Sequence, residues 1–110
     1  MQLTRGDTKK YYFQRKNKDG EVIIDAPSAI YFTVKRQYFD QDPLIQKTLD
    51  DMTLDADGTY HFTIEPTDTD GLKYGTYVFD IQVVNSNVKT TIAKCNLVVT
   101  EEVTFASNEV

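Results

Sequence analysis

Apolar and polar residues alternate along most of the chain, which is the pattern of half-buried β-strands. The clearest case is residues 76–84, where four apolar side chains share one parity: Tyr77, Phe79, Ile81 and Val83. Because successive side chains of a strand point to opposite faces, Asp80 and Gln82 are expected on the other face. This segment is predicted to be a central strand.

Six further segments predict short strands by the same period: residues 9–16, 21–24, 29–36, 45–49, 59–65 and 90–100. The segment 45–49 is rich in Lys and Gln, which favours an edge strand. In 90–100 the apolar parity changes along the segment, and a β-bulge would switch the faces.

Turn residues separate these segments. Asp19-Gly20 predicts a tight hairpin turn that joins 9–16 to 21–24, and Asp57-Gly58 predicts a second turn. Residues 66–72 predict a loop or one helical turn, with Pro66 at the first helical position. Short strands joined by turns indicate an all-β fold, an antiparallel β-sandwich of about seven strands.

The composition fits one folded domain. The chain has 110 residues, of which 40% are hydrophobic and 12% aromatic. We expect a domain over residues 1–105 and a flexible tail over 106–110. No apolar run approaches the ~20 residues that cross a bilayer, and the first residues lack a secretion signal.

Charge is unevenly distributed. The net charge is −5, but residues 1–36 carry eight basic and four acidic side chains, whereas residues 37–110 carry four and thirteen. An acidic chain argues against nucleic-acid binding. This segregation of charge suggests that the chain forms a homo-oligomer or binds another protein. The candidate surface that would steer such a partner by its charge consists of Lys9, Lys10, Arg15 and Lys16. Alternatively, lysines on an edge strand discourage unwanted pairing.

Candidate catalytic and metal-binding residues are few. The single histidine, His61, is expected on the outer face of a strand, and the single cysteine, Cys95, as a small buried apolar residue. Four aspartate pairs suggest calcium: Asp40/Asp42, Asp50/Asp51, Asp55/Asp57 and Asp68/Asp70. Their spacing fails the EF-hand pattern, so they are interpreted as turn residues. We expect no enzyme activity, no metal site and no cofactor.

Two other patterns have competing explanations. Arg5-Gly6-Asp7 spells an integrin-binding tripeptide, but it is more simply a kink between two short strand pieces. Several tyrosines could form a platform for sugar rings, although strand tyrosines are often half-buried packing residues: Tyr11, Tyr12, Tyr31, Tyr38, Tyr74 and Tyr77.

A family resemblance rests on six features in order, at residues 3–7 (LTRGD), 19–20 (DG), 30–35 (IYFTVK), 58–68 (GTYHFTIEPTD), 72–81 (LKYGTYVFDI) and 97–104 (LVVTEEVT). Over about residues 2–105 the chain resembles the small Ig-like domains of phage and prophage virion proteins from Gram-positive hosts. Among these, it resembles the N-terminal domain of upper-baseplate, or receptor-binding platform, proteins.

The resemblance implies that the β-sandwich is an antiparallel Ig-like β-sandwich of about seven strands. It also implies a non-enzymatic structural module of a virion, in a tail, a baseplate or a head accessory, which is made in the bacterial host cytoplasm without a signal peptide. Such a module acts through contacts with other virion subunits or with its own copies, and membranes and nucleic acids are not expected partners. The competing hypothesis is a carbohydrate-binding or adhesion module that uses the exposed tyrosines.

Overall fold

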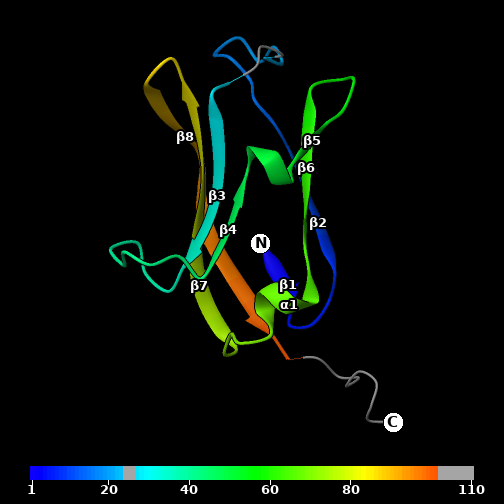
Figure 1. Cartoon of the computed structure of the whole chain (residues 1–110), viewed down its shortest axis with the longest axis vertical. Coiled ribbons are helices and arrows are strands. Elements are labelled where there is room, and N and C mark those ends of the chain that lie inside the picture. Colours follow the sequence, from blue (N-terminus) through cyan, green and yellow to red (C-terminus); the bar gives the residue numbers. More distant parts are fainter. Residues whose placement is uncertain (24–26, 102–110) are drawn as a thin grey trace.

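The computed structural model describes residues 1–23 and 27–101 and is predominantly β (Figure 1). Its elements are β1 (Gln2–Thr4), β2 (Lys9–Gln14), β3 (Ala29–Lys35), β4 (Ile45–Thr48), the 3-10 turn η1 (Leu49–Asp51), β5 (Thr53–Leu54), β6 (Thr59–Ile64), α1 (Pro66–Thr69), β7 (Gly75–Asn85) and β8 (Val88–Thr100). The all-β prediction is confirmed.

The strands form two sheets that face each other (Figure 1). One has five strands in the order β1-β8-β7-β3-β4, and the other has three in the order β2-β6-β5. The larger sheet is mixed, because β1 runs parallel to β8. The prediction of antiparallel strands is wrong for this pair. The chain kinks at Gly6, whose φ is 87°, and passes from the larger sheet to the smaller one between β1 and β2.

The core lies between the sheets. Strands β3, β6 and β7 bury every second side chain, as their sequence alternation predicts. Phe32 of β3 and Phe62 of β6 are 0% and 1% exposed, and their ring centroids are 4.6 Å apart. The facing side chains therefore interlock across the two sheets, which excludes water from both inner faces.

Several local predictions are confirmed. Strand β7 lies between β8 and β3, and β4 is an edge strand. The register of β7 and β8 shifts after Ile81, which leaves Ile92 as the extra residue of a bulge. Pro66 stands in the first turn of α1, and Gly58 adopts a φ of 88° in the turn between β5 and β6.

The hairpin predicted around Asp19-Gly20 is wrong in part. The turn exists, with φ of 82° at Gly20, but the segment after it forms only one isolated bridge, Lys16 to Val22. Strand β2 instead pairs along its whole length with β6. This pairing places Tyr11 and Phe13 in contact with the rings of β6, which buries more apolar surface than the short return segment offers. Residue 24 of the predicted return strand lies outside the described residues.

The predicted domain end at residue 105 and the tail 106–110 also lie outside the described residues, since the description ends at Glu101. No helix in the part of the chain that the structure describes is long and apolar enough to cross a membrane.

Candidate functional site

The four basic residues predicted as a steering surface do not lie together on one exposed face. Lys10 and Lys16 are exposed, and Lys9 is half-buried. Arg15 is only 7% exposed. The structure therefore leaves Lys10 and Lys16 as the members of the set that reach solvent fully.

His61 and Cys95 lie on different sheets. His61 is on the outer parity of β6, with its ring 5.3 Å from that of Tyr12 and its Nδ1 3.4 Å from an Asp55 carboxylate oxygen. Cys95 pairs with Phe79 across β7 and β8. The two side chains are not brought together, so they do not form a nucleophile and base.

The prediction that Cys95 is buried is wrong, because its side chain is exposed. Its parity is that of the buried Leu97 and Val99. However, β1 pairs with β8 only over residues 98–100, and at Cys95 the strand already forms the border of the sheet. The side chain reaches solvent past that border.

The aspartates mainly hold turns. Carboxylate oxygens of three of them accept backbone N–H bonds from Gln37, Thr48 and Thr59, and these three are Asp40, Asp51 and Asp57. Asp68 caps α1 by accepting the N–H of Glu65 and pairs with Lys47 Nζ at 2.8 Å. Among the described residues, no three His, Cys, Asp or Glu side chains converge as a metal site would require.

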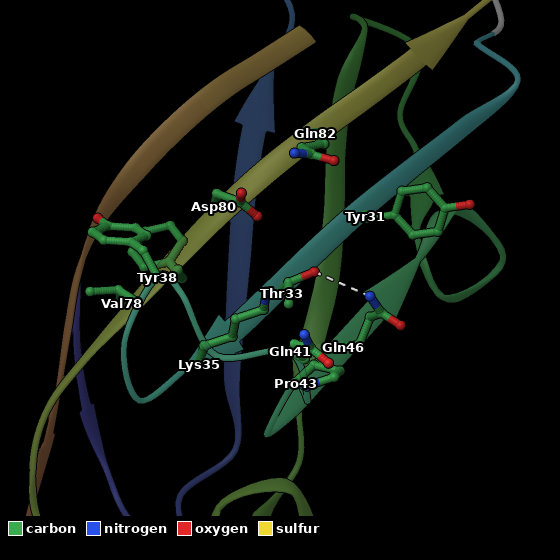
Figure 2. Close-up of a pocket in the computed structure, with 11 residues that line it drawn as sticks. Tyr31, Thr33, Lys35, Tyr38, Gln41, Pro43, Gln46, Val78, Asp80 and Gln82 are labelled. Carbon is green, nitrogen blue, oxygen red and sulfur yellow. Dashed lines mark hydrogen bonds between the residues drawn. The ribbon is translucent and has the colours of Figure 1, made fainter. Parts of the chain in front are cut away.

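One polar groove crosses the outer face of the five-stranded sheet (Figure 2). The register pairs Asp80 with Lys94 and with Thr33, and Thr33 with Gln46. Four polar side chains thus form a row across β8, β7, β3 and β4. The groove has a volume of about 290 Å³ and is lined by Tyr31, Thr33, Lys35, Tyr38, Gln41, Pro43, Gln46, Val78, Phe79, Asp80 and Gln82.

Two tyrosines stand at opposite ends of this groove, with Asp80 and Thr33 between them (Figure 2). Tyr38 comes from the loop after β3, and Lys94 Nζ lies 4.4 Å from its ring centroid. Tyr31 comes from β3 itself. The loop that carries Tyr38 is tightened by the hydrogen bond from Gln37 to Asp40.

Asp80 is the most unusual group in the groove. Burial raises the pKa of its carboxyl, and the charges of Lys35 and Lys94 only partly oppose this. In the described part of the chain, its oxygens accept no hydrogen bond, whereas Gln46 Nε2 donates to Thr33 Oγ1 at 3.2 Å. A partly desolvated carboxylate without a donor is a strong acceptor for a ligand.

A second candidate surface is the unpaired side of β8 over residues 88–95, which we call the free edge. Strand β7 covers one side of this stretch. On the other side, β1 reaches only residues 98–100, and no other strand of the described chain pairs there. Val88 and Ile92 are 63% and 38% exposed on this stretch, which also carries Lys89 and Lys94.

Backbone groups at the free edge point outward at known positions. Val98 donates its N–H to the carbonyl of Met1 at 2.9 Å, and the Asn96 carbonyl accepts from the Met1 amino group at 3.0 Å. Alternate residues of a strand direct their N–H and C=O to the same side. Lys94 therefore presents both backbone groups at the free edge.

The sequence singled out Tyr31 and Tyr38 of the groove among several tyrosines, but it predicted neither surface as a whole. The groove depends on the register of four strands, which alternation within each strand does not reveal. The free edge depends on how short β1 is, and its residues Gln2–Thr4 show ordinary alternation that does not reveal strand length.

No protein-family model matches the chain, and no curated protein is significantly similar to it in sequence.

Proposed function

We propose that this chain is a non-enzymatic structural module of a phage or prophage virion, in a tail, a baseplate or a head accessory, with an Ig-like β-sandwich fold. It acts through protein–protein contacts with other virion subunits or with its own copies. The observation that carries the assembly role is the free edge of β8, which offers unpaired backbone donors and acceptors to another chain.

The strand order supports the Ig-like part of the proposal. Ig domains place strands B, E and D in one sheet and G, F and C in the other, with C′ added in variable-type domains. The orders β2-β6-β5 and β8-β7-β3-β4 follow the same pattern. Many Ig domains also contain a tyrosine near the start of strand F that bonds back to the backbone. Tyr77 of β7 does so, donating to the Lys73 carbonyl at 2.6 Å.

An aromatic cluster occupies the place of the usual disulfide. In antibody domains the F-strand cysteine follows the tyrosine by two residues, bonds to strand B and packs on a tryptophan of strand C. Here that position is Phe79, whose ring lies 6.1 Å from Tyr11 of β2 and 5.5 Å from Phe32 of β3. The three rings connect the same three strands without a disulfide, in keeping with a single cysteine.

The free edge supports pairing with an extended segment of a neighbouring subunit. Main-chain hydrogen bonds supply affinity in such β-augmentation, and side chains set specificity. Lys89 and Lys94 favour a segment that carries acidic side chains, and the exposed Val88 and Ile92 add apolar contact. The bulge at Ile92 and the lysines also limit indiscriminate pairing with other edges.

Copurification tests this proposal. The chain is expressed together with the proteins encoded by its flanking genes, and we expect it to copurify with at least one of them. Lys94→Pro removes an outward N–H and should abolish the association, whereas Lys94→Ala keeps the N–H and should retain it. Purification of the wild-type chain alone, as a monomer and without any of these proteins, would contradict the assembly role.

A further inference from the structure

We propose that the groove on the outer face of the five-stranded sheet binds a pyranose sugar unit, with the Asp80 carboxylate accepting hydrogen bonds from its hydroxyls and Tyr38 packing on its ring. This inference concerns a surface other than the assembly edge and does not depend on the virion role.

Asp80 lies between the two tyrosines of the groove (Figure 2). Its carboxylate lies between Lys94 and Thr33 in the cross-strand row, and in the described chain it accepts no hydrogen bond. A partly buried acceptor gains most from a ligand that brings donors to both oxygens. Neighbouring hydroxyls of a sugar ring are such donors.

The side chains around Asp80 include both donors and acceptors of hydrogen bonds. Gln41, Gln46 and Gln82 supply amide donors and acceptors, and Lys35 supplies a further donor. An apolar ligand would leave these groups unsatisfied, and an anion would meet the Asp80 charge. A neutral polyol, whose hydroxyls both donate and accept, satisfies all of them.

The two tyrosines of the groove offer apolar ring surface to a ligand. Tyr38 is 46% exposed, so part of its ring is open to a ligand even though Lys94 lies over it. Figure 2 shows Tyr31 at the other end of the groove. Polar side chains of β3, β4 and β7 lie between the two rings: Thr33, Gln46, Asp80 and Gln82. Rings at both ends provide apolar surface for the C–H face of a sugar, and polar groups between them fix its orientation.

The size of the groove limits the ligand. A volume of about 290 Å³ is at the lower end of the range of ligand pockets, about 300–1,000 Å³. The groove therefore suits one sugar unit, which is either a free sugar or one residue of a polysaccharide.

The test is a titration of the isotope-labelled chain followed by amide chemical shifts, with methyl α-D-glucopyranoside, N-acetyl-D-glucosamine and L-rhamnose as probes. We expect at least one probe to shift the amides of Thr33, Asp80 and Gln82, with a dissociation constant of about 1 mM. The linear trimer of N-acetyl-D-glucosamine is titrated beside the monomer. Tighter binding of the trimer would indicate that the ligand is one residue of a polysaccharide, and equal binding would indicate a free sugar.

Matched variants locate the site. Asp80→Asn should weaken binding about tenfold or more, because it removes a charged acceptor, and Tyr38→Ala should weaken it similarly. Tyr12→Ala removes an exposed tyrosine of the other sheet and should leave binding unchanged. The proposal is overturned if no probe shifts the groove amides, or if folded Asp80→Asn binds as tightly as wild type.

Discussion

The hydroxyl of Tyr77 donates a 2.6 Å hydrogen bond to the backbone carbonyl of Lys73. Tyr77 is 3% exposed and belongs to β7, whereas Lys73 lies in the connection that follows α1. This connection carries the chain from the three-stranded sheet to the five-stranded sheet. The bond therefore anchors the connection between the two sheets to the beginning of β7.

Replacing Tyr77 by Phe removes only the hydroxyl. We expect the free energy of unfolding to fall by about 0.5–1.5 kcal/mol, the net worth of one such hydrogen bond. The measurement is chemical denaturation of both proteins, with Tyr12→Phe as the control, since Tyr12 is 56% exposed. Equal midpoints for Tyr77→Phe and wild type would show that the bond contributes nothing to stability.

Phe79→Ala should destabilise the chain by about 3–5 kcal/mol, because it leaves a cavity in the core. The Phe79 ring contacts both Phe32 and Tyr11, so the loss affects both sheets. Asp80→Ala, one residue along on the outer face, should cost much less. Similar unfolding midpoints for these two variants would mean that the faces of β7 are assigned incorrectly.

The alternation of residues within each strand was enough to predict most of the core. In β3, β6 and β7 the buried side chains are those that the period of two selects. Alternation does not predict which strands pair. Asp19-Gly20 does form a turn, but β2 does not pair with the segment that follows this turn. It pairs with β6, and aromatic side chains of the two strands are in contact.

Exposure and the groove depend on relationships between strands. Cys95 has inward parity, but it is exposed because β1 ends before reaching it. The row of Asp80, Thr33 and Gln46 arises from the registers of three strands that are distant in sequence. No pattern within one segment indicates that these side chains are neighbours.

Asp80→Asn should stabilise the chain at neutral pH. Burial raises the pKa of Asp80 in the folded state above its value in the unfolded chain, so folding takes up a proton between the two values. The contribution of Asp80 to stability therefore falls as the pH rises through this interval. Denaturation at a series of pH values should show the advantage of Asn near pH 7 and its loss in acid. An advantage that is the same at all pH values would contradict this account.

Lys10 and Lys16 are the exposed remainder of the basic set and are expected to steer association with an acidic surface. The double variant Lys10→Glu and Lys16→Glu should associate more slowly than wild type, at low salt, with a partner that carries such an acidic surface. The difference should disappear at about 1 M salt, where screening is nearly complete. Stopped-flow light scattering at both salt concentrations measures the association rates of the variant and of wild type. Equal rates at low salt would contradict a steering role for Lys10 and Lys16.

Amide hydrogen exchange at Lys94 tests most directly whether the free edge of β8 is the assembly surface. In the isolated chain the Lys94 N–H points away from β7 and should exchange quickly, whereas that of Cys95, on the β7 side, should exchange slowly. In the complex with a copurified subunit, we predict that the Lys94 amide becomes protected as Cys95 already is. Rapid exchange at Lys94 in the assembled state would contradict pairing at this edge.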